Sequence, residues 1–203
     1  MSPLFASHIS DIRKIKVLIH SFLCQSLQNW KLHIIHDGFD ALMDETLRPF
    51  SESHPEITYQ FTESRHNDFG HSLRDMGIKV VDTEYLLITN DDNYYVPEFL
   101  KLMFNEIAMN KLDMVLCDMV HSNINVSDGK MYYLKDQYTY FRTYPQKFLI
   151  DIGCFIVRTS LAKEVGFRDK SFTGDGTFVE DIMSRFGQSI RVGKLEKVLF
   201  VHN

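Results

Sequence analysis

The sequence has no long hydrophobic run and few cysteines. No stretch approaches the ~20 apolar residues that a membrane-spanning helix needs, and the run from Ile15 to Cys24 is interrupted by Lys16, His20 and Ser21. No basic segment followed by an apolar core opens the chain, so a secretory signal is not expected. The cysteines at positions 24, 117 and 154 are odd in number and widely spaced. They fit buried thiols in a reducing compartment. We therefore expect a cytoplasmic location, which allows peripheral association with a membrane.

Basic residues are also fewer than acidic residues. Lys and Arg total 22 against 27 Asp and Glu, which gives a formal net charge of −5 and a pI of ≈ 6.0. This balance lacks the overall signature of a nucleic-acid-binding protein, and we expect no nucleic-acid partner.

Glycine-rich phosphate loops are missing as well. The P-loop pattern GxxxxGK[ST] does not occur. Residues 6–13 contain no Gly, which argues against a sugar nucleotidyltransferase, because that class needs such a loop after its first strand. A phosphohydrolase with a nucleophilic Asp would carry its acidic motif near the N-terminus rather than at residue 90.

Apolar and aromatic residues are plentiful. Hydrophobic residues make up 44% of the 203 residues, and the aromatics comprise 16 Phe, 9 Tyr and one Trp. These proportions are typical of a globular chain, and the length fits one domain.

Up to residue 118 the apolar spacing alternates between strand and helix periods. The spacing predicts strands over residues 4–6, 31–36, 57–62, 84–89 and 112–117, and helices over 12–25, 40–48, 70–81 and from Pro97 onward. Alternation of this kind is typical of a parallel α/β sheet, whose ligands bind beyond the carboxyl ends of the strands. That rule points to Ser7, to Asp37 and to the segment Asn90–Asn93.

After residue 118 the pattern changes. Residues 123–130 are rich in turn formers, and residues 132–148 gather seven aromatic side chains. These aromatics either face a sugar acceptor or pack beneath an irregular segment. A strand over 151–158, helices over 161–165 and 177–186, and a strand over 198–201 follow. Thr177 and Glu180 have the spacing of a capping box. No linker is visible, so we expect a single domain.

The segment Asn90-Asp91-Asp92-Asn93 follows an apolar strand. Adjacent carboxylates repel one another unless a cation neutralises them, and Mg²⁺ or Mn²⁺ prefers such oxygen ligands. An Asp- and Asn-rich turn has the same composition. The residues alone leave both interpretations open.

Five segments, in order, resemble the GT-A glycosyltransferases. They are Ser21–Ser26 (SFLCQS), Trp30–Gly38 (WKLHIIHDG), Gly70–Pro97, Gly153–Phe167 (GCFIVRTSLAKEVGF) and Val198–Asn203 (VLFVHN). Within the third, Asn90-Asp91-Asp92 falls on the DxD motif, with Asn in place of the first Asp. The chain is most similar to the inverting glycosyltransferase family 2, and the resemblance covers nearly its whole length.

The resemblance implies an α/β fold. It would be a single Rossmann-like GT-A domain with a mostly parallel central sheet, in which residues 1–118 bind the nucleotide sugar and residues 119–203 bind the acceptor. It implies transfer from a UDP- or GDP-linked sugar to a saccharide or lipid-linked acceptor, in polysaccharide or glycoconjugate synthesis, with Mn²⁺ or Mg²⁺ as the cofactor.

The resemblance also assigns site residues. Metal ligands would be Asp92 and His202. Nucleotide contacts would come from Ser7, Asp37, Arg74, Asn90 and Asp91. For Arg74 an exposed helix charge is the equal alternative.

An inverting transfer also needs a carboxylate that takes the proton of the acceptor hydroxyl. Asp175 lies nearest to where the family places this acid, and Asp181 is the second candidate. The Asn at position 90 and the short first strand motivate an alternative, a catalytically impaired relative that binds nucleotide or acts as a scaffold.

Overall fold

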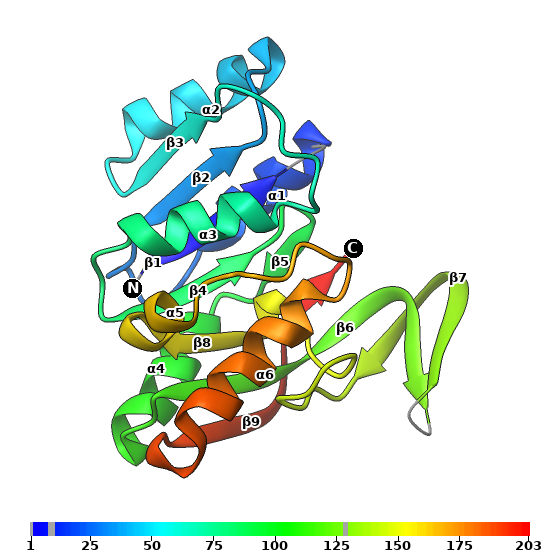
Figure 1. Cartoon of the computed structure of the whole chain (residues 1–203). Helices are drawn as coiled ribbons and strands as arrows, with labels where there is room; N and C mark the ends of the chain where they lie inside the picture. The colour runs from blue at the N-terminus through cyan, green and yellow to red at the C-terminus, as the bar shows by residue number, and fades with distance from the viewer. Residues whose placement is uncertain (1, 8–10, 128–129) are drawn as a thin grey trace.

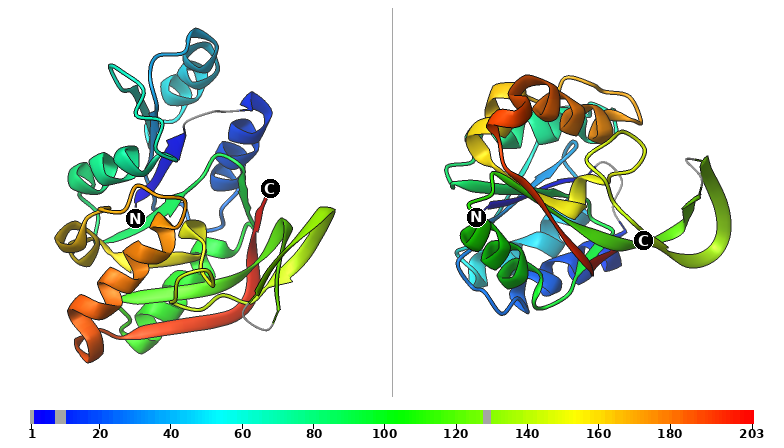
Figure 2. Two further views of the ribbon diagram at one scale, coloured as in Figure 1. Left: turned by 45° about the vertical axis from the view of Figure 1, so that its right-hand side comes forward. Right: turned by 90° about the horizontal axis from the view of Figure 1, so that it is seen from below.

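The computed structural model describes residues 2–7, 11–127 and 130–203. A central sheet lies between two layers of helices (Figures 1 and 2). Helices α3, α5 and α6 cover one face, and α1, α2 and α4 cover the other, as the view from below in Figure 2 shows. The α/β architecture expected from the alternating pattern is confirmed.

The first half of the sheet is parallel. Its strands lie in the order β3-β2-β1-β4, and each pairs in parallel with its neighbour. The strands are β1 (Ser2–Ser7), β2 (Leu32–His36), β3 (Ile57–Phe61) and β4 (Tyr85–Thr89). The connecting helices are α1 (Ile12–Leu23), α2 (Ala41–Ser53) and α3 (His71–Val80). All five positions of β4 are buried, as expected for a central strand.

The second half of the sheet is mixed. Beyond β4 the order continues β8-β6-β9-β5, where β8 runs antiparallel to both neighbours and β9 runs parallel to β6. The strands are β5 (Asn93–Tyr95), β6 (Met114–Ser127), β7 (Lys130–Phe141), β8 (Phe155–Arg158) and β9 (Val192–His202). The helices are α4 (Phe99–Asn110), α5 (Thr159–Val165) and α6 (Gly174–Phe186), with short 3₁₀ turns at η1 (Ile152–Cys154) and η2 (Gly187–Ser189).

Local signals account for α1. The side chain of Asp11 accepts a hydrogen bond from the backbone N–H of Arg13 and caps the helix. At the other end, the buried Gln25 donates to the carbonyls of Ser21 and Val96, and its Oε1 accepts from Leu100 N at 3.0 Å. These bonds join the end of α1 to the start of α4.

Two predicted helix boundaries are wrong. Helix α2 continues through Pro49 to Ser53, because the carbonyl that loses its donor belongs to the exposed Glu45. Helix α4 begins at Phe99, so Pro97 precedes the helix rather than occupying its first position.

The predicted capping box is also wrong. Helix α6 begins at Gly174, three residues earlier than expected, so Thr177 lies inside it. Thr177 Oγ1 donates to Asp169 Oδ2 (2.5 Å), and Glu180 Oε1 accepts from the backbone N–H of Lys147 (3.1 Å).

Residues 123–148 depart most from expectation. Strands β6 and β7 pair as a long antiparallel hairpin with a register shift between Ser122 and Ile124, and the hairpin projects from the body of the molecule (Figure 1). Strand β9 begins six residues before the predicted closing strand, and it follows β6 in parallel to the register pair His121 and His202.

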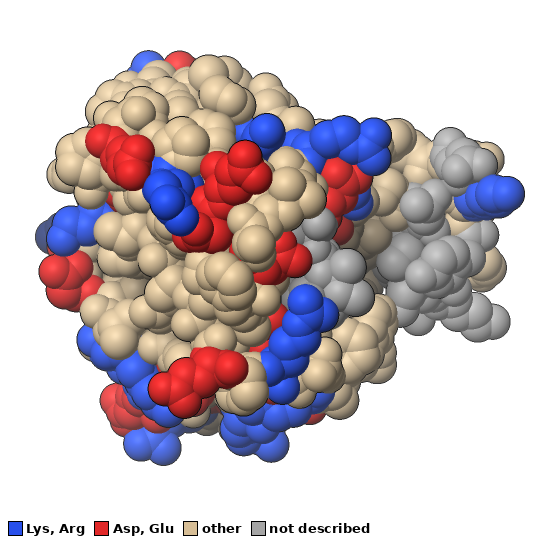
Figure 3. Space-filling view, turned by 90° about the horizontal axis from the view of Figure 1, so that it is seen from above, with Lys and Arg blue, Asp and Glu red and all other residues tan. Residues whose placement is uncertain are grey.

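The surface of the upper face mixes charges of both signs (Figure 3). None of the helices in the described part of the chain is long and apolar enough to cross a membrane.

Candidate active site

A cleft of about 530 Å³ opens where several strands of the sheet end. It lies between the segment after β4, the middle of β6, the end of β9 and the start of α6. Its lining includes the polar side chains of Arg74, Asn90, Asp91, Asp92, Asp175 and His202. The sheet therefore brings together six of the nine residues that the sequence analysis singled out.

The guanidinium of Arg74 contacts three other polar side chains at the cleft. Its side chain is 5% exposed, and Nη1 donates to Asp175 Oδ1 at 2.6 Å. Nη2 donates to Asn90 Oδ1 at 2.6 Å. Of the two interpretations of Arg74, the exposed helix charge is wrong, because α3 presents this residue to the cleft.

His71 supports the same guanidinium from the first turn of α3. Its Nδ1 lies 2.7 Å from Arg74 Nη1, and its Nε2 lies 2.8 Å from the carbonyl oxygen of Ser171. Burial and, after it, the charge of Arg74 lower the pKa of His71 to about 4. A neutral His71 therefore accepts from Arg74 and donates to Ser171, which ties α3 to the loop before α6.

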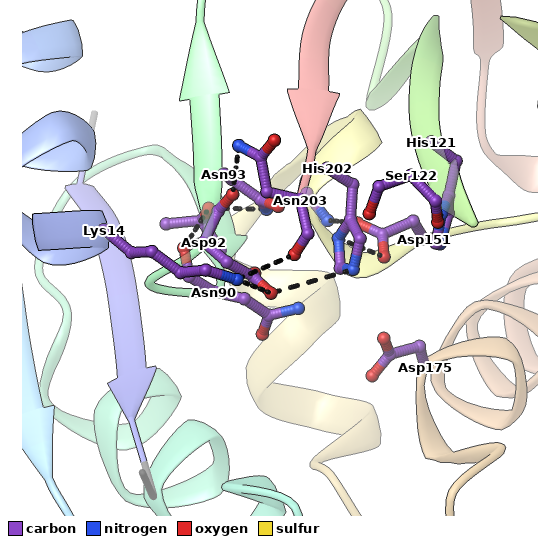
Figure 4. A network of polar contacts seen from close by, with 12 residues as sticks. Lys14, Asn90, Asp92, Asn93, His121, Ser122, Asp151, Asp175, His202 and Asn203 are labelled. Carbon is purple, nitrogen blue, oxygen red and sulfur yellow. Dashed lines mark hydrogen bonds and ion pairs between the residues drawn. The ribbon is translucent and has the colours of Figure 1, made fainter. Parts of the chain in front are cut away.

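Asp175 lies in the first turn of α6 and points into the cleft (Figure 4). Burial raises the pKa of this carboxyl; the nearby Asp151 adds to the rise, whereas Arg74 and His202 oppose it. A carboxylate with a raised pKa that is paired with a cation is a stronger base than a solvated one.

Asp92 and His202 lie side by side, because β5 and β9 pair with Asn93 and His202 in register. Asp92 Oδ2 lies 4.0 Å from His202 Nε2, and Asp92 Oδ1 is buried without a hydrogen-bond partner among the described residues. The other ring nitrogen of His202, Nδ1, lies 3.5 Å from Asp151 Oδ2 (Figure 4).

This pair fits a divalent cation in part. Asp92 Oδ1 has no partner among the described residues, and Asp92 Oδ2 faces an imidazole nitrogen. The carboxylate behind the imidazole is the kind of group that orients a metal-binding His. Within residues 2–7, 11–127 and 130–203, no cluster of three or more His, Cys, Asp or Glu side chains completes a metal site. The remaining ligands would come from a bound substrate and water.

Asp37 is not part of the cleft lining. It is fully buried after β2, and its two oxygens accept the backbone N–H groups of His66 (2.8 Å) and Asn67 (2.9 Å). Burial alone would raise the pKa of Asp37, but these two bonds, with Thr62, lower it overall. In the structure Asp37 holds the loop after β3.

Ser7 and Asp181 complete the set of predicted site residues, and Asp181 is not part of the cleft lining. Ser7 ends β1 opposite His36, but its side chain and His8 lie outside the described residues. Asp181 lies on α6 and pairs with Arg168 through two hydrogen bonds of 2.5 and 2.8 Å.

Several residues at the cleft were missed by sequence reasoning. Lys14, His71, His121 and Asp151 all line it. The rings of His121 and His202 lie 4.4 Å apart, because β6 and β9 place the two residues in register. No local motif marks these positions, although Lys14 and His71 both occupy the first turn of a predicted helix.

Aromatic side chains surround the opening of the cleft. Phe69, Phe148 and Phe172 line it and are 49%, 58% and 68% exposed. Of the aromatics between residues 132 and 148, Tyr138, Tyr140 and Phe148 are more than half exposed and Phe141 is buried. Packing therefore explains only part of that cluster.

The parallel half-sheet, the mixed half-sheet and the acidic segment after β4 define a GT-A fold. The chain matches the sequence profile of glycosyl transferase family 2 over residues 12–166. It therefore belongs to this family, as the sequence motifs indicated.

Solved structures share the fold. The crystal structure of S. aureus TarS 1–349 has a TM-score of 0.73 and 16% identity, and the match covers 100% of this chain and 60% of that one. TarS 1–349 in complex with UDP-GlcNAc has a TM-score of 0.68 and 19% identity, over 99% of this chain and 58% of that one.

The mannosyltransferase PcManGT from Pyrobaculum calidifontis, in complex with GDP-Man and Mn²⁺, has a TM-score of 0.70 and 11% identity, over 99% of this chain and 56% of that one. The chain thus spans about 60% of the length of TarS 1–349. No curated protein matches it in sequence.

Proposed function

We propose that the protein is an inverting glycosyltransferase that moves a sugar from a nucleotide-diphosphate sugar to an acceptor hydroxyl. One observation carries the proposal: Asp92, His202 and Asp175 line a single cleft. The donor would be UDP- or GDP-linked, since the similar structures hold UDP-GlcNAc or GDP-Man. The product would be a polysaccharide or another glycoconjugate.

Asp175 is the proposed general base. It takes the proton of the acceptor hydroxyl as that oxygen attacks the anomeric carbon, and Arg74 holds its Oδ1 at 2.6 Å. Asp181 does not fit this role, because its carboxylate is paired with Arg168 outside the cleft.

Asp92 and His202 are the residues that would hold a divalent cation, Mn²⁺ or Mg²⁺. When bound, such an ion offsets the negative charge of the leaving diphosphate. Asp151 keeps His202 oriented, with Nδ1 3.5 Å from its carboxylate, so that Nε2 faces Asp92.

The acceptor is proposed to approach over the exposed rings of Phe69, Phe148 and Phe172. Aromatic faces stack on sugar rings and also contact lipid carriers, so either a saccharide or a lipid-linked acceptor fits. In this arrangement residues 1–118 bind the donor, and residues 119–203 supply the base and, apart from Phe69, the acceptor surface.

Nucleotide release tests the proposal. The protein is incubated with UDP- and GDP-sugars, Mn²⁺ and candidate acceptors, and the anomeric configuration of the product is read by NMR. Asp175→Ala is expected to lower the rate about 10²- to 10⁴-fold, and Asp92→Ala is expected to lower it in Mn²⁺. Asp181→Ala, a matched carboxylate on the same helix, is expected to leave it near that of the wild type. Undiminished release by both cleft variants would refute the assignments.

A nucleotide-binding relative without transfer activity is the second candidate. Asn90 replaces the first acid of the DxD motif, and its Oδ1 is already engaged by Arg74. Calorimetry separates the two functions, because this candidate predicts binding of UDP or GDP with no turnover of any sugar donor.

A further inference from the structure

Lys14 projects from the first turn of α1 toward the acidic segment after β4. Its Nζ lies 3.8 Å from Asp92 Oδ2 and donates to the carbonyl oxygen of Asn203 at 3.2 Å (Figure 4). No other Lys or Arg side chain in the described part of the chain pairs with Asp92. Lys14 therefore places an ammonium group beside the proposed metal ligand.

The ammonium of Lys14 is accessible to a ligand. Its side chain is 42% exposed, and its one hydrogen bond among the described residues goes to Asn203. Lys14 also lies where two cavities meet: it lines the main cleft and a second cavity of about 260 Å³, and both cavities share Asp92 and Asn203. A flexible lysine with unused donors at such a position can turn toward an anion.

The charge around Asp92 favours this role. The neighbouring position 90 is Asn, so the DxD motif lacks its first carboxylate, and the Asn90 oxygen accepts from Arg74. Asp92 thus has an ammonium on one side and His202 on the other. Fewer carboxylates and a nearby cation weaken the attraction of the site for a divalent ion, because ligand charge sets that affinity.

We propose that Lys14 is a donor-binding residue whose ammonium contacts the diphosphate, so that the cleft holds a nucleotide diphosphate even without a divalent ion. The inference rests on the proposed function of the cleft. A lysine binds phosphate as a point charge through charge-assisted hydrogen bonds. Here the ammonium lies beside Asp92, the proposed metal ligand, so it can offset the charge of the diphosphate when no metal is bound.

Calorimetry with UDP and GDP tests the proposal without any sugar transfer. Wild type, Lys14→Met and Lys14→Arg are titrated in EDTA and again in saturating Mn²⁺. Lys16→Met is the matched control, because Lys16 carries the same charge on the same helix but is exposed outside both cavities. Circular dichroism checks that each variant is folded.

We expect wild type to bind nucleotide in EDTA, and Lys14→Met to bind about tenfold more weakly there, as for one lost charge-assisted hydrogen bond. The loss of nucleotide affinity in Lys14→Met is expected to be smaller in saturating Mn²⁺ than in EDTA. Lys14→Arg keeps the charge and stays within about threefold of wild type, and Lys16→Met is unchanged. Without nucleotide, Lys14→Met binds Mn²⁺ more tightly than wild type in an EPR titration, because a like charge is removed.

The outcomes separate the two proposals. Equal nucleotide affinity of wild type and Lys14→Met in EDTA, or wild-type binding that requires Mn²⁺, overturns the role of Lys14 and leaves the proposed function standing. A wild type that binds neither nucleotide in either buffer overturns both.

Discussion

The substitution Arg74→Met is the sharpest test of the network beneath the cleft. Methionine keeps a side chain similar to the aliphatic stem of arginine but removes the guanidinium. The change deprives three groups of their partner: Asp175 Oδ1 at 2.6 Å, Asn90 Oδ1 at 2.6 Å and His71 Nδ1 at 2.7 Å. Of these, only Asp175 carries a charge, so it dominates the expected effect.

The magnitude follows from the burial of the pair. Removing one partner of a buried ion pair costs about 3–5 kcal/mol, because the other charge remains buried and uncompensated. Arg74 is 5% exposed but Asp175 is 22% exposed, so water solvates part of the abandoned carboxylate. We therefore expect Arg74→Met to lower the free energy of unfolding by about 2–3 kcal/mol at pH 7.5.

The loss should depend on pH in a defined direction. Burial raises the pKa of Asp175, and Arg74 opposes that rise. Without Arg74 the pKa of the folded state rises further above that of the unfolded chain. A carboxyl whose pKa is higher in the folded than in the unfolded state destabilises the fold at pH values above the unfolded pKa, because the unfolded state releases the proton more readily than the folded state. The destabilisation by Arg74→Met should therefore shrink as the pH falls and Asp175 takes up a proton.

Urea unfolding at pH 7.5 and pH 4.5 measures both quantities. Arg168→Met is the matched control, because Arg168 is 68% exposed and pairs with the other candidate acid, Asp181. We expect little change in stability for that variant at either pH. An Arg74→Met loss that is equal at the two pH values, or no larger than that of the control, would refute the reasoning that Arg74 compensates a buried Asp175 charge.

Three further predictions concern single side chains. Gly153→Ala should lower the free energy of unfolding by about 1–3 kcal/mol, because its Cβ would lie 2.8 Å from the Tyr95 hydroxyl oxygen; an unchanged urea midpoint would contradict this. Asp37→Asn should cost about 1–3 kcal/mol at pH 7. Because the folded pKa of Asp37 is lowered, that contribution is present above the unfolded pKa and is lost as the pH falls through the folded pKa, so urea unfolding near pH 3 should show a smaller difference. Mn²⁺ with UDP should raise the Tm of wild type more than UDP alone, and Asp92→Asn should abolish the added increment; an equal increment in the variant would exclude Asp92 as a ligand.

Much of the parallel half of the fold could be predicted because its signals are local. The cap of α1 and the apolar run of β4 each depend on a few adjacent residues. The same locality explains why residues 90–92 line the cleft, since a polar segment directly after a buried strand must lie at the carboxyl edge of the sheet.

The hairpin of β6 and β7 could not be predicted in this way. Its residues read as a turn-rich segment and an aromatic cluster, whereas pairing between strands decides their conformation. The same applies to the contact between His121 and His202, which are 81 positions apart in the sequence and meet only because β9 runs beside β6.

The choice between the two candidate bases shows how one helix boundary decides chemistry. The sequence predicted a helix over residues 177–186, which put Asp175 before the helix and Asp181 within it. In the structure α6 begins at Gly174 and contains both residues. Six residues turn a helix by about 600°, so the two carboxylates point about 120° apart and only one can face the cleft. Asp175 faces Arg74 in the first turn, where the positive end of the helix dipole favours its charged form against the cost of burial. Asp181 faces outward to Arg168. The corrected boundary therefore adds a physical reason for preferring Asp175 over Asp181 as the proposed base.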